Sequence, residues 1–327
     1  MATILFTHYK DIPGYRMEAG PYTAFICAAR GANCISFAEH EANFLRTPNS
    51  FSELGENPNL YGMPLLFPPN RICNGMFFFG GNLYRFPINE PARGHHIHGF
   101  LSSTPFALDS MECDTQKASL SFCYEATIKE PYLSFPHAFK ISLRYLLDQS
   151  GLHQLVQLEN RSNRSMPAGL GFHTTFNACF LPHTEPSDYK IKVSVGEEIE
   201  LDRTTIIPTG NYLPDSPLLH ELGKKGLQFS DKAISNHFTC DKNLHESLLF
   251  HVPSGRALRY TTESQYTFWM LFNGGGNQGF ICVEPQTWMV DAPNSPLAPD
   301  QTGFMVLEPG QSIQLESKLQ GVTIPLI

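Results

Sequence analysis

Polar side chains interrupt four otherwise apolar segments of this chain, and their types suit acid–base chemistry or hydrogen bonding to a small polar molecule. The first segment holds Asn70 and Arg71, which follow a Pro-rich turn. The guanidinium of Arg71 is a planar set of N–H donors that fits hydroxyl or carboxylate oxygens. A surface arginine beside a loop explains this segment equally well, so the segment predicts no site by itself.

The second segment carries three histidines in four positions, His95, His96 and His98. On a strand, His96 and His98 point to the same face, and H-x-H is a spacing found among metal ligands. A cupin metal site also has a glutamate a few residues later, and residues 101 to 106 contain no acid. Hydrogen-bonded core histidines are the alternative, although burying unpaired polar rings is unfavourable.

The other two segments place single polar residues in apolar strands. His173 follows a Gly-rich approach, and Glu284 closes the apolar run Ile281-Cys282-Val283. A lone histidine among aromatic residues is more often structural than catalytic, whereas a carboxylate in such a strand is seldom buried without a partner or a chemical role. We expect the strand to stop at Pro285, because proline donates no ladder hydrogen bond.

The composition favours strands and argues against several classes of partner. Charged residues make up only 17% of the chain, and 25 Phe, 25 Gly and 25 Pro are spread along it, a composition typical of strands and turns. A net charge of −8 without clustered Lys and Arg argues against nucleic acid. Neither a membrane-spanning apolar run nor a signal peptide is recognisable, so we expect a cytoplasmic protein without a membrane partner. The eight cysteines form no C-x-x-C pair and are expected to be free thiols.

Short alternating stretches predict antiparallel strands. Residues 141–145 and 155–158 flank a turn at a glycine and predict a β-hairpin. Residues 266–272 and 280–283 predict two more strands, joined by a Gly-rich turn whose glycines tolerate positive φ.

Helical patterns are confined to residues 37–45 and 218–222, and neither sustains an apolar stripe. Strand patterns continue to the end of the chain without a linker or repeat. The sequence therefore predicts an all-β fold, one large antiparallel β-sandwich with few short helices, in a single domain over residues 1–327.

Taken in order, the four polar segments resemble the aldose 1-epimerase (galactose mutarotase) family. Asn70-Arg71-Ile72 is similar to the family's N-R-I, and His98-Gly99 to its L-H-G, with Ile in place of Leu. The stretch 173–177 resembles its H-x-Y-F-N, with Thr in place of Tyr, and the stretch 284–287 its E-P-x-T. The similarity runs from about residue 31 to about residue 310.

The resemblance implies a galactose mutarotase-like supersandwich that binds a monosaccharide on its concave face and interconverts the α and β anomers of an aldose. It implies catalysis without a metal or other cofactor. Glu284 would act as the base that takes the C1 hydroxyl proton, and His173 as the acid that protonates the ring oxygen. An ionised Glu284 opposite a protonated His173 is the expected arrangement, because each charge favours the other.

The resemblance also implies residues that hold the sugar. Arg71 and His98 would hydrogen-bond the ring oxygen or hydroxyls, with Asn70 and His96 as further members of the pocket. We expect the aromatic ring of Trp269 to stack on the apolar face of the sugar.

Two departures from the family pattern concern substrate binding. Family members usually carry an Asp that holds sugar hydroxyls, whereas the nearest stretch here, residues 234–238, contains no acid. A Gln or Phe often contributes to the pocket before the Glu strand, and Trp269 or Met270 lies nearest here. The sequence thus predicts the reaction type and leaves the physiological sugar open.

Three alternatives remain open, as does the choice between a monomer and a homodimer. The first is epimerisation of a different sugar or of a phosphorylated one, and a phosphate would require an added basic cluster, for which Arg85 and Arg93 are the candidates. A non-catalytic sugar-binding domain is the second alternative, although retention of the acid–base pair argues against it. The third is a metal-dependent β-barrel enzyme that uses His96 and His98.

Overall fold

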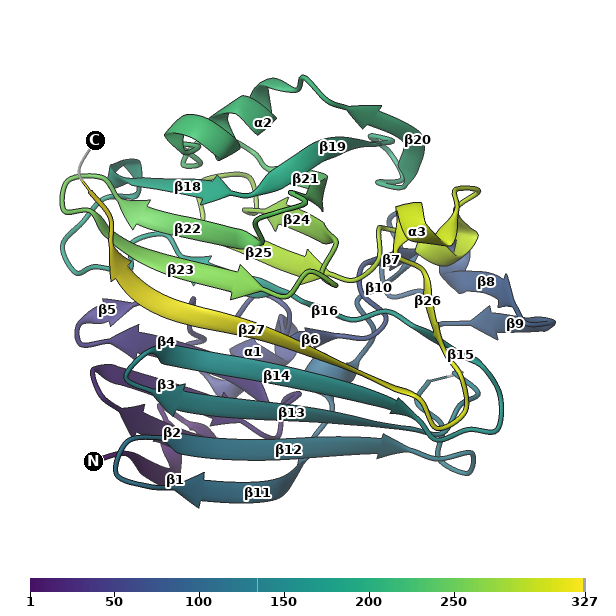
Figure 1. Cartoon of the computed structure of the whole chain (residues 1–327), viewed down its shortest axis with the longest axis horizontal. Coiled ribbons are helices and arrows are strands. Elements are labelled where there is room, and N and C mark those ends of the chain that lie inside the picture. Colours follow the sequence, from purple (N-terminus) through teal and green to yellow (C-terminus); the bar gives the residue numbers. More distant parts are fainter. Residues whose placement is uncertain (134, 326–327) are drawn as a thin grey trace.

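The computed structural model describes residues 1–133 and 135–325 of the chain. In this part of the chain, strands dominate and pair antiparallel throughout the large sheets. The sheets stack as two layers, which confirms the predicted β-sandwich (Figure 1).

One layer is a single sheet of eight strands in the order β11-β12-β13-β14-β27-β23-β22-β18, counted over the described residues. Its strands are β11 Ala107–Cys113, β12 Ala118–Ala126, β13 Phe139–Asp148, β14 Gly151–Asn160, β18 Tyr189–Val193, β22 Glu246–His251, β23 Arg256–Thr262 and β27 Ser312–Thr323. Figure 1 shows the yellow C-terminal strand β27 in the middle of this sheet, between β14 and β23. Strand β27 therefore pairs with two strands, β14 and β23, that are far apart in sequence.

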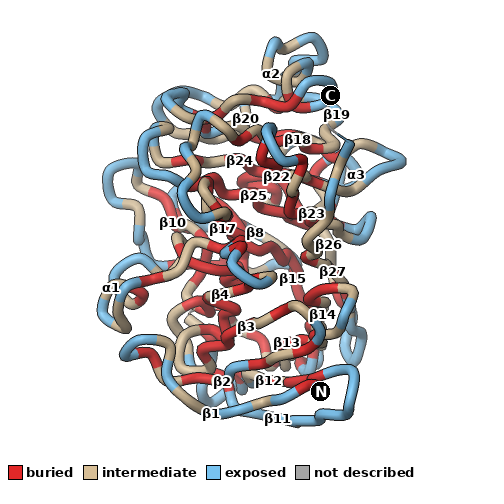
Figure 2. Tube along the Cα trace, turned by 90° about the vertical axis from the view of Figure 1, so that its left-hand side faces the viewer, coloured by how far each residue is buried: buried red, intermediate tan, exposed pale blue. Residues whose placement is uncertain are grey.

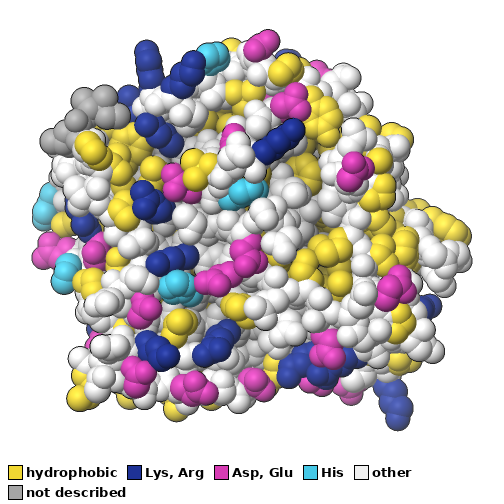
Figure 3. Space-filling view, in the orientation of Figure 1, with side chains coloured by type: hydrophobic (Ala, Val, Ile, Leu, Met, Phe, Trp, Pro, Cys, Tyr) yellow, Lys and Arg dark blue, Asp and Glu magenta, His cyan; other side chains and the backbone are white. Residues whose placement is uncertain are grey.

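The side chains of the long sheet alternate between the core and solvent. In β13, Ile141, Leu143 and Tyr145 are buried, whereas Arg144 is exposed. The outer face accordingly shows Lys and Arg interspersed with Asp and Glu (Figure 3). This two-residue period is the pattern that a sheet with one solvated face requires.

The second layer contains two sheets. A five-stranded sheet consists of β1 Thr3–Tyr9, β2 Ile12–Ala19, β3 Tyr22–Cys27, β4 Asn33–Glu39 and β5 Ala42–Asn43, and β2 and β3 contact β13 of the long sheet. The other sheet runs in the order β20-β19-β21-β24-β25-β16-β6, with β17 also paired to β25. Its strands are β6 Leu65–Leu66, β16 Gly171–Phe172, β17 Thr174–Asn177, β19 Val195–Leu201, β20 Pro208–Leu213, β21 Ser235–Cys240, β24 Phe268–Phe272 and β25 Phe280–Gln286.

Short ribbons and helical turns complete the layers. The ribbons pair β7 Arg71–Ile72 with β10 His96–Ile97, β8 Met76–Phe79 with β9 Asn82–Arg85, and β15 Met166–Ala168 with β26 Met305–Leu307. The helices are α1 Phe51–Glu56, α2 Pro217–His220 and α3 Pro299–Thr302, with helical turns η1 Cys73–Gly75, η2 Leu101–Ser103, η3 Pro186–Asp188, η4 Glu221–Lys225 and η5 Ala292–Asn294. None of the helices in the described residues is both long and apolar enough to cross a membrane.

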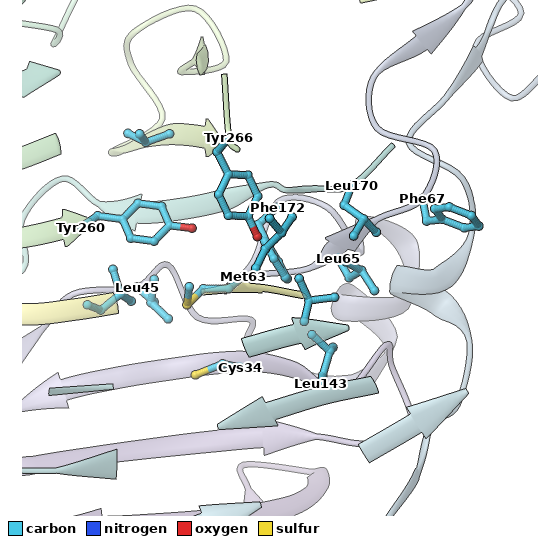
Figure 4. Packing of buried hydrophobic residues seen from close by; sticks show 14 of the residues in the cluster. Cys34, Leu45, Met63, Leu65, Phe67, Leu143, Leu170, Phe172, Tyr260 and Tyr266 are labelled. Carbon is cyan, nitrogen blue, oxygen red and sulfur yellow. The ribbon is translucent and has the colours of Figure 1, made fainter. Parts of the chain in front are cut away.

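The apolar core lies between the two layers. Figure 4 shows Leu143 of β13 on one side and Leu65 of β6 and Phe172 of β16 on the other, and all three are fully buried. The edge-on view in Figure 2 shows the buried segments running through the middle of the molecule. This continuous core holds the second layer in place and thereby positions the outer face of β24 and β25.

Most of the predicted elements are confirmed. The hairpin is β13–β14, with Asp148 paired to Gly151, and β24–β25 is the second predicted strand pair. Residues 218–222 are helical, and all eight cysteines are free.

The predicted helix over residues 37–45 is wrong. This segment forms the turn between β4 and β5, in which Glu39 pairs with Ala42 and His40 has a φ of 52°. Phe37 and Phe44 are both fully buried, so packing on the core and pairing with β3 override a local helical pattern.

The expected strand end at Pro285 is also wrong. Strand β25 runs on to Gln286, which pairs with Phe268 on one side and Gly171 on the other. Pro285 itself lies opposite Trp269.

Candidate active site

A pocket with a volume of about 270 Å³ lies on the side of β24 and β25 that faces away from the long sheet, beside the ribbon β7–β10. This volume is just below the usual range for small-molecule sites, roughly 300–1,000 Å³, and suits a ligand as small as a monosaccharide. Five of the seven residues predicted from the sequence line the pocket: Asn70, Arg71, His98, His173 and Glu284.

Side chains alternate between the two faces of β25, and this alternation directs the carboxylate of Glu284 into the pocket. Glu284 lies opposite Met270 of β24, and both side chains line the pocket, whereas Val283 belongs to the core cluster. Glu284 is only 1% exposed, and Asn70 hydrogen-bonds to Gln286, two residues further along the same strand.

His173 lies between β16 and β17 and faces Glu284. Its Nε2 atom is 3.3 Å from Oε1 of Glu284, and the two side chains are 6% and 2% exposed. Burial raises the pKa of Glu284 to about 8 and lowers the pKa of His173 to about 4. These directions favour the uncharged forms of both side chains over the expected ion pair in the free site.

His98 completes a compact group of donor atoms. One side-chain atom of each of His98, His173 and Glu284 that could ligate a metal lies within 4.8 Å of the other two. His98 has a φ of 64°, so it leaves the strand direction of β10 and turns into the pocket. Its Nδ1 accepts a hydrogen bond of 3.3 Å from the backbone N–H of Asn70, and the proton of the neutral ring is therefore on Nε2.

The hydrogen bonding of His98 does not fit a metal ligand. A metal binds the unprotonated ring nitrogen, and in His98 that nitrogen, Nδ1, is already occupied by a backbone donor. Nδ1 of His173 has no hydrogen-bond partner among the described residues, although ligating histidines usually donate their second N–H to an acceptor.

Arg71 forms a bidentate ion pair across the pocket wall. Its Nε and Nη2 each lie 2.8 Å from a carboxylate oxygen of Glu90, and Nη1 of Arg93 lies 2.8 Å from Oε1 of the same residue. Glu90, Arg71 and Arg93 all line the pocket. Together they carry two positive charges and one negative charge, because the paired arginines hold the pKa of Glu90 below its ordinary value despite partial burial.

Comparison with known proteins identifies the family. A family model described as aldose 1-epimerase matches residues 14–320 of the chain. The chain belongs to the aldose 1-epimerase family.

Individual relatives and solved structures match most of the chain. The uncharacterized protein YihR of Escherichia coli K12 is 24% identical over 263 residues, which are 80% of this chain and 79% of YihR. A galactose mutarotase-like protein from Clostridium acetobutylicum is 28% identical, with a TM-score of 0.93 over 99% of both chains. Galactose 1-epimerase from Lactobacillus acidophilus has the same fold, with a TM-score of 0.75 over 99% of each chain at 16% identity. The predicted family and its galactose mutarotase-like fold are thus confirmed.

Two residues that the resemblance placed in the epimerase pocket lie elsewhere. Trp269 is fully buried in the core, 6.2 Å from the ring of Tyr260, and its Nε1 has no hydrogen-bond partner within the described ranges. It is one residue away from Met270, so strand alternation points it to the opposite face of β24. The prediction that Trp269 stacks on the sugar is therefore wrong.

His96 is also directed away from the pocket. Its Nδ1 donates a hydrogen bond of 2.8 Å to the carbonyl of Pro87, and its ring packs against Phe86 and Phe100. The strand β10 ends at Ile97, and the left-handed turn at His98 separates the two histidines. The same-face spacing of H-x-H does not apply here.

Sequence reasoning missed two polar residues of the site. Glu90 supplies a carboxylate to the pocket, whereas the stretch 234–238 contributes only Ser235. Glu90 lies in a loop, and no sequence pattern marks it. Gln286 donates a hydrogen bond of 3.2 Å from Nε2 to Oε2 of Glu284. The two-residue spacing on one strand was the available signal for Gln286, and it was lost because the strand was expected to end at Pro285.

Proposed function

We propose that this chain is a mutarotase that interconverts the α and β anomers of a hexose by acid–base catalysed ring opening and closure, without a cofactor. The observation that carries the proposal is the buried pair of His173 and Glu284, whose facing atoms are 3.3 Å apart in a monosaccharide-sized pocket. Family membership supports an isomerase that acts on a sugar.

The reaction requires two proton transfers at the anomeric end of the sugar. Glu284 takes the proton of the C1 hydroxyl while His173 protonates the ring oxygen, and the bond between C1 and the ring oxygen breaks to give the open-chain aldehyde. Rotation about the C1–C2 bond and the reverse transfers close the ring with the opposite configuration. Each positioned transfer contributes roughly 10²–10⁴-fold to the rate.

The reactive form, a carboxylate beside an imidazolium, contains the same number of protons as the uncharged form of the pair. One transfer over the 3.3 Å from Glu284 to His173 converts a carboxylic acid and an imidazole into a carboxylate and an imidazolium. Sugar hydroxyls that donate to Glu284 favour the charged form, because hydrogen bonds to a carboxylate stabilise it. The two groups therefore titrate as a unit.

Three neighbouring side chains suit the binding of the sugar oxygens. Nε2–H of His98 is available as a neutral donor, and Arg71 retains N–H donors beyond the two that Glu90 accepts. Carboxylate oxygens of Glu90 are acceptors for sugar hydroxyls, a role that compensates for the missing family Asp.

The position of Arg93 favours a second candidate, the same reaction on a sugar with an anionic substituent. Arg93 lines the pocket with 38% of its side chain exposed, whereas Arg85 lies on β9 outside it. Two arginines and one glutamate leave an excess positive charge for a phosphate or a similar group. If Arg93→Gln raises KM for an aldose 6-phosphate at least tenfold but not for the free aldose, this candidate replaces the first.

Polarimetry of freshly dissolved α-D-glucose and α-D-galactose tests the proposal. The wild type should accelerate equilibration, and Glu284→Gln and His173→Gln should each lose at least 100-fold of that acceleration, whereas the exposed Glu112→Gln should retain it. An unchanged spontaneous rate with wild type on neutral and phosphorylated aldoses would point to a non-catalytic sugar-binding protein.

We also propose that the whole chain forms one catalytic domain. The cytoplasmic location and the choice between monomer and homodimer stay predictions.

A further inference from the structure

A chain of hydrogen bonds with a fixed direction leads from the backbone to Glu284. The backbone N–H of Arg71 donates to Oδ1 of Asn70 at 3.0 Å, and Nδ2 of Asn70 donates to Oε1 of Gln286 at 3.2 Å. Gln286 in turn donates from Nε2 to Oε2 of Glu284 at 3.2 Å.

The direction follows from chemistry. A backbone N–H can only donate, so the Asn70 atom that it meets must be the oxygen and the other end of the amide must be the NH₂ group. The same logic then orients the amide of Gln286. Glu284 consequently faces a donor on one oxygen and His173 on the other.

Asn70 also fixes the proton of His98. Its backbone N–H donates to Nδ1 of His98, and its carbonyl accepts from the backbone N–H of His98 at 3.1 Å. Asn70 has a φ of 57°, a left-handed conformation that asparagine tolerates better than most residues. Its side chain is committed to Arg71 and Gln286 and is 1% exposed, so little of it is left for a sugar.

We propose that Asn70 is a positioning residue that acts through Gln286 to keep a hydrogen-bond donor on the carboxylate of Glu284. This inference deepens the proposed function and rests on it. It replaces the contact between Asn70 and the sugar that the family resemblance implied.

This relay, the hydrogen bonds that run from Asn70 through Gln286 to Glu284, should lower the pH at which Glu284 ionises. Among the described residues, the titratable or charged groups around Glu284 are His173, His98, Arg71, Glu90 and Arg93 of the pocket and Cys282 of its own strand. None of them is altered by substituting Gln286, so the effect of its donor can be isolated. Loss of a hydrogen bond to a charged group corresponds to a shift of about one pH unit.

Three variants separate the steps of the relay. Gln286→Met keeps the length of the side chain and removes the donor. Asn70→Gly removes the side chain but tolerates the left-handed backbone, so the bond to Nδ1 of His98 is kept. Gln154→Met is the matched control, because Gln154 is also a buried glutamine but hydrogen-bonds to Tyr145 and Ser317 of the long sheet.

The readouts are the pH profile of mutarotation and the ionisation of Glu284 followed by carboxyl ¹³C NMR. Gln286→Met should lower kcat roughly tenfold, leave KM within about twofold and move the ionisation of Glu284 upward by about one pH unit. Asn70→Gly should shift it in the same direction by less, and the double variant should match Gln286→Met alone. Gln154→Met should leave the ionisation where it is in wild type.

Several outcomes would overturn the relay. An unchanged Glu284 titration in Gln286→Met, an additive double variant, or a raised KM with unchanged kcat in Asn70→Gly would each contradict it. The NMR titration does not depend on turnover. A shifted titration without any mutarotation in wild type would therefore support the relay and reject the proposed function.

Discussion

Replacement of Glu284 by glutamine should stabilise the fold, and increasingly so as the pH rises. The buried carboxyl has a pKa raised from its ordinary 4.5 to about 8. Between these values the folded chain holds a proton that the unfolded chain has released. The free energy of unfolding of the wild type must therefore fall as the pH increases across this window.

The magnitude is clearest between pH 6.5 and pH 8. One pKa unit corresponds to about 1.4 kcal/mol, so the wild type should lose about 2 kcal/mol over this interval through Glu284 alone. The effect of His173 on stability lies mostly below pH 6.5, because its pKa is lowered from 6.5 to about 4. Gln286 can still donate to the amide oxygen of a glutamine at position 284.

Urea unfolding at pH 6.5 and pH 8 measures this effect. The stability gap between Glu284→Gln and wild type should widen by about 2 kcal/mol from the lower to the higher pH. Glu112→Gln, the same chemical change on exposed strand β11, should show a constant gap near zero. An equally constant gap for Glu284→Gln would refute the reasoning, because the carboxyl would then not be protonated in the folded chain.

Three further predictions concern the surroundings of the pair. Trp269→Phe should reduce the free energy of unfolding by about 2 kcal/mol and leave KM for the sugar unchanged in steady-state assays, because the ring belongs to the core. Gly99→Ala should lower both Tm and kcat, because Gly99 has a φ of 65° and the added Cβ would lie 2.0 Å from the carbonyl oxygen of Phe67. Gly99 directly follows His98, and an unchanged Tm would contradict this prediction. Dialysis against a chelator should leave the rate of mutarotation unchanged, because the free nitrogen of His98 carries a proton; loss of activity that zinc restores would contradict that assignment.

The sequence was sufficient for the elements that follow a regular period. Alternating strands such as β13 and β14 were predictable, and a polar residue in an apolar strand marked Glu284 and His173. Period two also decides which side chains share a face, so an error of one position reverses the orientation. The sequence offered Trp269 or Met270 for the pocket and the aromatic ring favoured Trp269, but alternation along β24 places Met270 there.

The remaining errors arise where tertiary structure changes the local backbone. His98 turns out of β10 through a left-handed conformation, and its H-x-H partner His96 remains in the core. Glu90 lies on a loop and reaches the pocket through its pairing with Arg71, a contact that no local pattern announces. Burial, which only the folded chain defines, shifts the pKa values of Glu284 and His173 toward their uncharged forms.

The pH dependence of kcat/KM for mutarotation tests the central claim most directly, namely that His173 and Glu284 share one proton and move it during the reaction. The account predicts a bell-shaped profile. Activity should fall below pH of about 4, where the pair gains a second proton, and above pH of about 8, where it loses the only one. A rate that stays constant from pH 5 to pH 10 would contradict the claim.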